Sequence, residues 1–294
     1  MSAPVVSVVA VTYSSGDSLG AFLDSLETAT TQPYEVVLAD NGSSDDSIKA
    51  AITRPHVRVI ETGGNLGYGQ GTNVGVAAAE AGLVVIANPD IVWDPGSLDQ
   101  LISAVKRWPD AGSFGPLIRT PTGEIYPSAR AVPSLREGIG HALFGWWWPS
   151  NPWTASYRLE RGEPTERAAG WLSGSCLLVR RSAFDAVNGF DPAYFMYFED
   201  LDLGERLGRA GYQNVYVPDA VVIHTGGHAT RREPARMAAQ HHRSAWTYLC
   251  RRYPGWRYLP VRLVLRVGLA ARSALASRVP SVAEGAPPQR TTRG

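Results

Sequence analysis

Residues 5–13 of the chain are VVSVVAVTY, a nearly continuous run of β-branched residues that ends in Thr12 and Tyr13. Such runs are typical of strands that are covered on both faces, as in a parallel sheet with helices on either side. Asp17 or Ser18 follows and can cap a helix whose apolar residues recur at helical spacing. We therefore predict a strand and then a helix at the start of the chain.

The same alternation continues along the chain. Strands that alternate with helices predict an α/β fold with a mainly parallel central sheet that helices flank. Further strands are predicted at 34–40, 57–61, 83–88, 111–118, 170–179, 213–217 and 221–224. Helices are predicted near 44–52, 71–81, 97–107, 181–187 and 199–210.

Composition limits the class of protein. The 294 residues are 44% apolar, enough for a large core, which excludes a disulfide-stapled mini-protein and a disordered tail. Cys176 and Cys250 are far apart and give neither a disulfide framework nor a zinc spacing. The first ten residues lack a signal-peptide pattern, and no uncharged apolar stretch is long enough to cross a bilayer. We expect a cytoplasmic protein.

The charge is divided unequally along the chain. Up to Thr230 there are 15 Lys and Arg against 25 Asp and Glu, and from Arg231 onward 13 against 2. An acidic body with a basic tail favours a tail that meets an anionic surface. Apolar residues alternate with arginines over 251–278, which fits a basic amphipathic helix in the headgroup layer; a terminal helix packed on the body is the alternative. Residues 280–294 are predicted to be disordered.

Polar residues follow three of the predicted strands. Thr12-Tyr13, Asp40-Asn41-Gly42 and Asn88-Pro89-Asp90 each stand where a strand ends. Ligands of open α/β sheets bind outside the carboxyl ends of the strands, so one small molecule could touch all three. Simple turn chemistry is the alternative explanation for Asp40-Asn41-Gly42.

A glycine-rich segment at 63–71 precedes a predicted helix and could cradle a phosphate. Gly67 and Gly69 would need a third glycine at position 72 to complete a dinucleotide-binding pattern, but that residue is Thr72. The segment also lacks the lysine of a P-loop. A nicotinamide-dependent oxidoreductase is therefore disfavoured.

Two acidic groups and one histidine remain as candidates for chemistry. Asp90 follows a strand, where a carboxylate can hold a divalent cation against a diphosphate. The acidic residues of 198–202 open a helix, where they ordinarily stabilise the helix dipole, but the aromatic residues before them favour a desolvated base among them. His224 closes a strand and is a candidate ligand or a packing residue.

Six short motifs occur in order along the chain. They are VVAVTY at 8–13, LADNGS at 38–43, GNLGYG at 64–69, NPD at 88–90, GWLSGS at 170–175 and FEDLD at 198–202. Together they resemble the ordered motifs of family-two inverting glycosyltransferases with the GT-A fold. The resemblance implies a GT-A domain over 1–230, with a nucleotide-binding half at 1–118 and an acceptor-binding half at 119–230. A basic helical extension would follow at 231–279.

The resemblance also assigns roles. Asp200 matches the general base, and a Mg²⁺ or Mn²⁺ ion would be held by Asp90 and His224. This sequence has Asn88 where the family's Asp-X-Asp motif begins with Asp, so one negative charge is missing. The donor would be bound by Thr12, Tyr13, Asp40, Asn41, Asn65, Gly67, Tyr68, Asn88 and Asp90. The acceptor would be bound by Trp171, Ser173, Gly174, Glu199 and Arg130.

Within that family, 119–130 and the tryptophan-rich stretch 146–153 are similar to rhamnosyltransferases. This implies inverting transfer of L-rhamnose from dTDP-L-rhamnose to an N-acetylglucosaminyl-diphospho-polyprenol in cell-wall linker assembly, at the cytoplasmic face of the membrane. The alternatives are the same fold with another donor, such as UDP-galactofuranose, or a non-catalytic nucleotide-sugar binding protein. We expect no nucleic-acid partner, because the body is acidic, and a homodimer is a further candidate assembly.

Overall fold

The computed structural model describes residues 3–133, 164–226, 234–260, 262–264 and 266–267. The chain forms two compact units, residues 1–232 and 233–294. The stretch 146–153, Arg231 and residues 280–294, all singled out in the sequence, lie outside the described residues.

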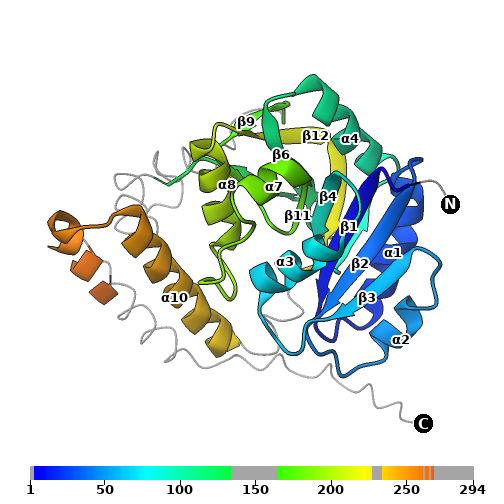
Figure 1. Cartoon of the computed structure of the whole chain (residues 1–294), viewed down its shortest axis with the longest axis horizontal. Coiled ribbons are helices and arrows are strands. Elements are labelled where there is room, and N and C mark those ends of the chain that lie inside the picture. Colours follow the sequence, from blue (N-terminus) through cyan, green and yellow to red (C-terminus); the bar gives the residue numbers. More distant parts are fainter. Residues whose placement is uncertain (1–2, 134–163, 227–233, 261, 265, 268–294) are drawn as a thin grey trace, which may run out of the picture. The chain divides into compact units, whose positions relative to one another are not determined.

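The first half of the large unit is a parallel sheet with the order β3-β2-β1-β4 (Figure 1). Its strands are β1 (Val6–Thr12), β2 (Tyr34–Asp40), β3 (Val57–Glu61) and β4 (Leu83–Ala87). Its helices are α1 (Asp17–Ala29), α2 (Ser47–Ala51) and α3 (Tyr68–Ala78). The parallel order brings the carboxyl ends of β1, β2 and β4 to one edge of the sheet.

The sheet continues from β4 as β11-β6-β12-β5, where β11 is antiparallel to both neighbours and β6 is parallel to β12. These strands are β5 (Ile91–Trp93), β6 (Ala111–Arg119), β11 (Cys176–Arg180) and β12 (Gln213–His224). The helices are α4 (Ser97–Arg107), α7 (Arg181–Ala186) and α8 (Glu199–Arg209). Short strands are β7 (Ile125–Tyr126), β8 (Ala129–Arg130), β9 (Arg167–Ala169) and β10 (Trp171–Leu172). The predicted α/β class, with a largely parallel central sheet, is confirmed.

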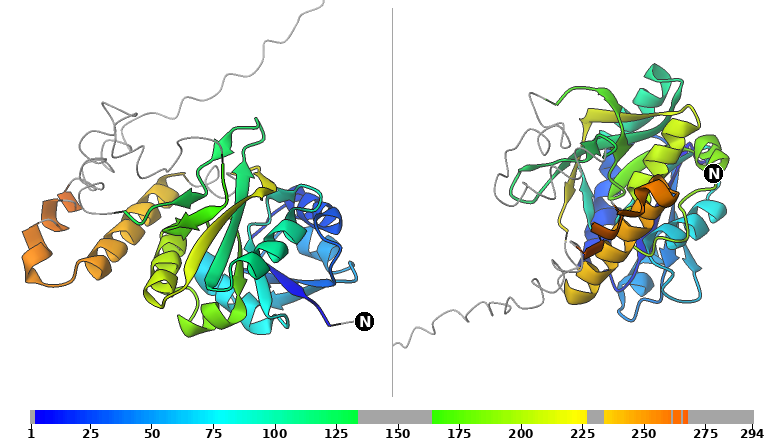
Figure 2. Two further views of the ribbon diagram at one scale, coloured as in Figure 1. Left: turned by 90° about the horizontal axis from the view of Figure 1, so that it is seen from above. Right: turned by 90° about the vertical axis from the view of Figure 1, so that its left-hand side faces the viewer.

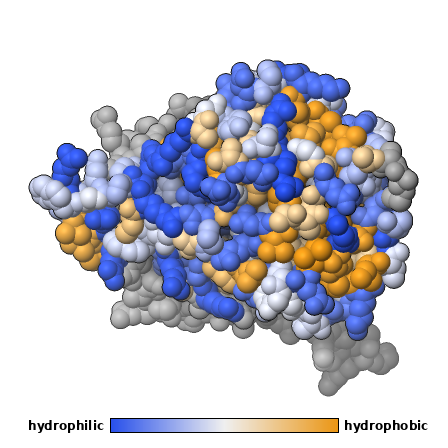
Figure 3. Space-filling model, viewed as in Figure 1, coloured by the Kyte–Doolittle hydropathy of each residue, from blue (hydrophilic) through white to orange (hydrophobic). Residues whose placement is uncertain are grey.

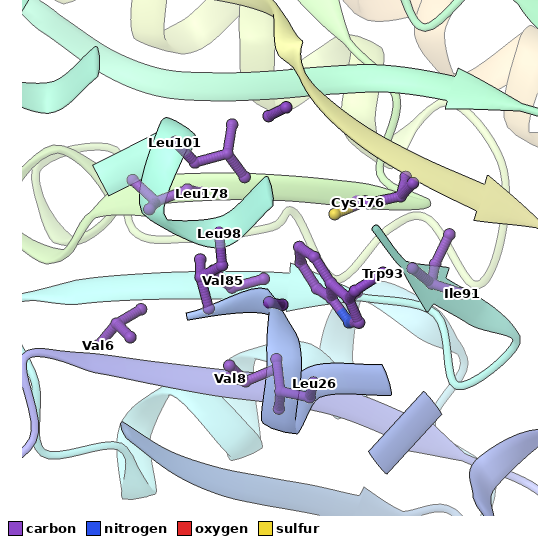
Figure 4. Close-up of a cluster of buried hydrophobic side chains, with 14 of the residues drawn as sticks. Val6, Val8, Leu26, Val85, Ile91, Trp93, Leu98, Leu101, Cys176 and Leu178 are labelled. Atoms are coloured by element: carbon purple, nitrogen blue, oxygen red, sulfur yellow. The ribbon is translucent and has the colours of Figure 1, made fainter. Parts of the chain in front are cut away.

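Hydrophobic residues fill both faces of this sheet. Val8 packs in a cluster with residues of α1 and α4, while its neighbour Val9 packs in a second cluster with residues of α3, α7 and α8. Figures 1 and 2 show the sheet with its flanking helices as ribbons. Figure 4 shows part of the first cluster, in which Val8, Leu26 and Leu98 come from a strand and two helices. Successive side chains of a strand point to opposite faces, so a strand buried on both sides needs apolar residues throughout.

Several element boundaries differ from the predicted ones. Helix α1 begins at Asp17, and the N–H of Gly16 donates to Asp45 Oδ2 at 2.9 Å, so neither Asp17 nor Ser18 caps the helix. The predicted strand 170–179 is two strands, β10 and β11, with residues 173–175 between them. Conversely, β12 is continuous through Pro218, with an irregular register between Val217 and Val221, because proline has no N–H to donate to the neighbouring strand.

The small unit begins with α10 (Pro234–Arg252) and continues through the 3₁₀ turn η1 (Trp256–Tyr258). A basic amphipathic helix was expected over 251–278; the described residues from 259 to 267 are helical, but they are separated from α10, which ends at Arg252. The residues that follow include Pro254, which cannot continue a helix, and Gly255, whose φ is +92°. In the described part of the chain, every helix is too short or too polar to span a membrane.

Candidate active site

Asp90 and His224 lie together where β4 and β12 end. His224 is the last residue of β12 and pairs with Ile91 of β5, which places it beside the turn that follows β4. His224 Nε2 is 3.1 Å from Asp90 Oδ1 and 3.2 Å from Asn88 Nδ2. Asp90 Oδ1 is buried and accepts no hydrogen bond from the residues described. Two electron-pair donors that face each other in this way fit a pair of metal ligands.

Glu199 and Asp200 occupy the first turn of α8. The two residues before them, Tyr197 and Phe198, have φ angles of +67° and +69°. Non-glycine residues in this conformation cost about 1–3 kcal/mol each and persist only where the surrounding structure holds them. They turn the chain sharply into the helix. Both oxygens of Asp200 are held by backbone N–H groups: Gly174 donates to Oδ2 at 2.9 Å and Leu201 to Oδ1 at 2.8 Å.

The two carboxyl groups have different surroundings. Burial raises the pKa of Asp200, but the N–H groups of Gly174 and Leu201 and the charge of Arg130 oppose that rise because they favour the carboxylate. Burial, and then the charge of Asp200, raises the pKa of Glu199, which is only 6% exposed. Glu199 Oε2 accepts no hydrogen bond from the described residues. The pair therefore favours a charged Asp200 beside a neutral Glu199.

Residues 173–175 connect the Glu199–Asp200 pair with the Asp90–His224 pair. Gly174 donates to Asp200, and the carbonyl of Ser175 accepts a hydrogen bond from the N–H of Asn88 at 2.8 Å. Asn88 in turn contacts His224. The structure thus brings Asp90, Asp200 and His224 to one edge of the sheet through a short chain of contacts.

Strands β1 and β2 supply a second group of polar residues at the same edge. Thr12 donates its hydroxyl to Asp40 Oδ1 at 2.9 Å, and the N–H and hydroxyl of Ser43 also bind the Asp40 carboxylate. Asn41 is buried; its Nδ2 donates to the carbonyl of Gly67 at 3.0 Å and its Oδ1 accepts from Thr62. Asn41 therefore holds the glycine-rich loop in place.

The glycine-rich loop packs against the segment before α8. Gly67 has a φ of +81°, and a Cβ at this position would lie 2.1 Å from the carbonyl oxygen of Phe195. That oxygen accepts the N–H of Tyr68 at 2.9 Å. Only glycine allows this close approach of the two backbones. Asn65 and Tyr13 are both exposed, and Asn65 Oδ1 accepts the N–H of Gly67 at 3.0 Å.

The residues assigned to the acceptor gather around β8 and β10. The Arg130 guanidinium lies over the Trp171 ring, 5.2 Å from its centre, and over the Tyr126 ring at 5.4 Å. Trp171 is buried and donates its indole N–H to Ala131, so its ring serves as a fixed platform for the arginine. Ser173 is buried, and its N–H donates to the carbonyl of Ser128.

Sequence reasoning missed some of the residues that shape this site. Asp202, the third acid of the 198–202 motif, forms an ion pair with Arg206 of the same helix. Ser175 and Phe195 act through backbone carbonyls, which any residue possesses, so side-chain chemistry gives no signal for them. Arg206, four residues after Asp202, was the one partner that helical spacing could have revealed.

Several known proteins with similar sequences are glycosyltransferases. Residues 7–187 match glycosyl transferase family 2, and residues 153–284 match glycosyl transferase family group 2. The chain is 54% identical over 286 residues to the N-acetylglucosaminyl-diphospho-decaprenol L-rhamnosyltransferase of Mycobacterium tuberculosis, with 93% of each chain covered. It is 30% identical to a rhamnosyltransferase of Escherichia coli, over 84% of this chain and 94% of that one.

Solved structures of glycosyltransferases share the fold. A mannosyltransferase from Pyrobaculum calidifontis, in complex with GDP-Man and Mn²⁺, has a TM-score of 0.57 at 18% identity and covers 96% of this chain and 77% of its own. TarS of S. aureus, residues 1–349 in complex with UDP-GlcNAc, has a TM-score of 0.56 at 16% identity. The match covers 83% of this chain and 66% of the TarS chain. At these identities the likeness concerns the fold, which agrees with the GT-A expectation. Together with the family match over most of the large unit, these findings show that the chain belongs to glycosyl transferase family 2.

Proposed function

We propose that this chain transfers L-rhamnose from dTDP-L-rhamnose to an N-acetylglucosaminyl-diphospho-polyprenol, with inversion at the anomeric carbon. The relative from Mycobacterium tuberculosis, 54% identical, carries that acceptor and that sugar in its name. The main structural support is the partly buried Asp200 carboxylate, held by two N–H groups within a few contacts of Asp90 and His224. A second rhamnosyltransferase among the relatives supports the same sugar.

Asp200 is the proposed general base. The acceptor hydroxyl must lose a proton as it attacks the anomeric carbon from the face opposite the leaving diphosphate. A carboxylate that backbone N–H groups hold in one orientation is suited to accept that proton, a role worth about 10²–10⁴-fold in rate. Burial raises the pKa of Glu199, which favours its neutral form and would leave Asp200 as the charged member of the pair.

Asp90 and His224 are the proposed ligands of a divalent cation, Mg²⁺ or Mn²⁺. The buried Asp90 Oδ1, which accepts no hydrogen bond from the described residues and faces His224 Nε2, fits such a group. Among the residues described, no cluster of three His, Cys, Asp or Glu side chains surrounds this position. The cation would supply charge neutralisation for the leaving diphosphate.

Thr12, Asp40 and the glycine-rich loop are the proposed donor side. Asp40 is fixed by Thr12 and Ser43, so its carboxylate is ready to receive an N–H of the base or a ribose hydroxyl. Asn41 and Asn65 would act on the donor through the loop, because their side chains bind Gly67. Arg130, over Trp171, is the proposed contact for the acceptor diphosphate.

The lipid acceptor places the enzyme at the cytoplasmic face of a membrane in this proposal. Exposed apolar side chains in the small unit support it, above all Trp256, Val264 and Val267, which are 82%, 71% and 68% exposed. Arg257, Arg262 and Arg266 are interspersed with them. In Figure 3 this segment, at the left of the view, carries orange side chains beside blue ones. Mixed apolar and basic side chains suit an anionic headgroup layer.

The proposal is tested with purified protein, the lipid acceptor, Mg²⁺ and a panel of nucleotide sugars. We expect a disaccharide lipid to form from dTDP-L-rhamnose in preference to UDP-galactofuranose. Asp200→Asn should lower kcat by about 10²–10⁴-fold and leave nucleotide binding within a few-fold of wild type. Asp185→Asn, which alters an exposed carboxylate on α7, is the matched control and should turn over normally.

Two results would contradict the proposal. Normal turnover by Asp200→Asn would exclude that residue as the base. Nucleotide binding that is independent of metal, together with no transfer from any sugar in the panel, would point to a binding protein instead.

A further inference from the structure

Both backbone polar groups of Gly174 are hydrogen-bonded to side chains. Its N–H donates to Asp200 Oδ2 at 2.9 Å, and its carbonyl oxygen accepts the phenol hydroxyl of Tyr68. The next carbonyl, that of Ser175, accepts the N–H of Asn88 at 2.8 Å. Side chains from α3 and α8 and the backbone after β4 therefore all meet on this one short segment.

Little space remains around this peptide. A Cβ added at Gly174 would lie 3.2 Å from Asp200 Cβ and 3.4 Å from Tyr68 Cε1. Contacts of 3.0–3.4 Å are tighter than nearly all those of real Cβ atoms. A side chain at position 174 would therefore crowd both Asp200 and Tyr68.

Tyr68 is itself fixed by the glycine-rich loop. It is the first residue of α3 and follows Gly67, and its own N–H donates to Phe195 at 2.9 Å. Its ring packs edge-on against Phe190 at 6.2 Å. Burial raises the pKa of Tyr68 well above its ordinary value, and the nearby carboxyl groups of Glu199 and Asp200 act in the same direction to the extent that they are ionised. The phenol therefore keeps its single proton, which it donates to Gly174.

We propose that Tyr68 is a positioning residue for the base: its hydroxyl fixes the carbonyl of Gly174 and thereby the backbone of this residue, whose N–H in turn fixes the Asp200 carboxylate. This rests on the proposed function only in naming Asp200 as the base. The hydrogen bonds from Tyr68 to Gly174 and from Gly174 to Asp200 would thereby couple the position of Asp200 to that of the glycine-rich loop. A direct contact between Tyr68 and the nucleotide sugar is the competing role.

The proposal has a consequence for the proton affinity of Asp200. An N–H that points at a carboxylate stabilises the charged form of that carboxylate. Loss of the Tyr68 hydroxyl should therefore weaken the hydrogen bond from the Gly174 N–H and raise the pKa of Asp200. The other groups that face Asp200 are Glu199 of α8, Arg130 of β8 and the N–H of Leu201. None of these is altered when Tyr68 becomes phenylalanine, because the ring remains.

The kinetic test is Tyr68→Phe, with pH profiles of kcat/KM for rhamnosyl transfer. We expect the acid limb to move up by about 0.5–1 pH unit, which corresponds to a hydrogen bond of ordinary strength. The KM for the nucleotide sugar should stay within about twofold of wild type. A raised KM with an unmoved acid limb would show a direct donor contact, and a uniform loss of activity with an unmoved limb would show a purely structural role.

A second measurement does not depend on turnover. In protein labelled with ¹⁵N-glycine, the Gly174 amide shift should follow the ionisation of Asp200, and the midpoint should rise in Tyr68→Phe. The titration should be lost in Asp200→Asn and unchanged in Tyr212→Phe, a matched change beyond the carboxyl end of α8, whereas Asp200 lies in the first turn of that helix. An unchanged midpoint in Tyr68→Phe would overturn the inference, even in an active enzyme. Absence of transfer by the wild type with the expected midpoint shift would instead overturn the proposed function alone.

Discussion

Glu199 is a carboxyl group buried next to the base. Its folded-state pKa is raised by burial and then by Asp200, whereas in the unfolded chain its pKa is ordinary, near ~4.3. The folded state therefore binds the proton more tightly than the unfolded state. Stability from this group is fully present below the unfolded pKa and is lost as the pH rises toward the folded pKa.

Glu199→Gln should remove this dependence, because glutamine keeps the shape without the charge. We expect the variant to melt at a higher temperature than wild type at pH 8, by roughly 2–4 °C for each kcal/mol gained in the free energy of unfolding. The difference should vanish near pH 4. Differential scanning calorimetry at several pH values measures it. A variant that is less stable than wild type at pH 8 would show that Glu199 is charged in the folded protein.

At the scale of single residues, the sequence predicts where a polar side chain lies in the sheet better than it predicts that side chain's hydrogen-bond partner. Asp90 and His224 could be placed at one edge because both follow strands, and strand ends are visible as polar residues after apolar runs. The partner of Asn41 is the carbonyl of Gly67, 26 residues away, which no local pattern reveals. The left-handed conformations of Tyr197 and Phe198 were equally hidden, since neither residue type favours them.

Helix α8 carries two acid–arginine pairs with the same spacing in different surroundings. Arg206 Nε binds Asp202 at 2.6 Å, and its Nη1 donates to the carbonyls of Val187 and Gly189. The second pair, Glu205 with Arg209, lies on the same helix. The Arg206 side chain is 23% exposed and that of Arg209 59%. The first pair thus ties the helix to the turn after α7.

We expect Arg206→Ala to lower the free energy of unfolding by about 3–5 kcal/mol, because it leaves Asp202 and two carbonyls without their partner in a buried place. Arg209→Ala, the matched control, should cost less than Arg206→Ala, because the Arg209 side chain is 59% exposed, although its partner Glu205 is only 9% exposed. Urea denaturation of the two variants compares them. Equal losses would show that the contacts of Arg206 with the 187–189 turn add nothing.

At the scale of elements, the sequence predicts the strands that are buried on both faces. β2 and β3 and helix α4 begin and end at the predicted residues, because apolar periodicity and turn residues agree there. The division of 170–179 into β10 and β11 was not predictable, since Ser173 and Gly174 are compatible with a strand. Long-range contacts decide it: Ser173 binds Ser128, and Gly174 binds Asp200.

At the scale of the whole molecule, the order of elements and the division of charge follow from the sequence. Alternating strands and helices imply a parallel first half, and the structure has it in β3-β2-β1-β4. The antiparallel insertion of β11 between β4 and β6 was not foreseen, because strand order beyond the first half depends on non-local pairing. The change from an acidic body to a basic tail near residue 230 is close to the boundary of the two compact units.

That basic tail leads to a prediction for membrane binding. The protein should sediment with vesicles that contain anionic lipid, and Val264→Ser with Val267→Ser should weaken this at every salt concentration, because both side chains are exposed and apolar. Arg257→Gln with Arg266→Gln should weaken binding about tenfold or more at low salt and less at high salt, since each arginine is worth about 1 kcal/mol at such a surface.

Ile52→Ser, an exposed apolar change in the large unit, is the control and should bind as wild type does. Unchanged sedimentation of both tail variants would contradict a membrane role for residues 256–267. Salt-sensitive retention on DNA, without binding to vesicles, would assign the basic tail to nucleic acid instead. A series of salt concentrations separates the two contributions to vesicle binding. The contribution of the exposed valines persists when salt screens the arginines, whereas the contribution of the arginines decreases.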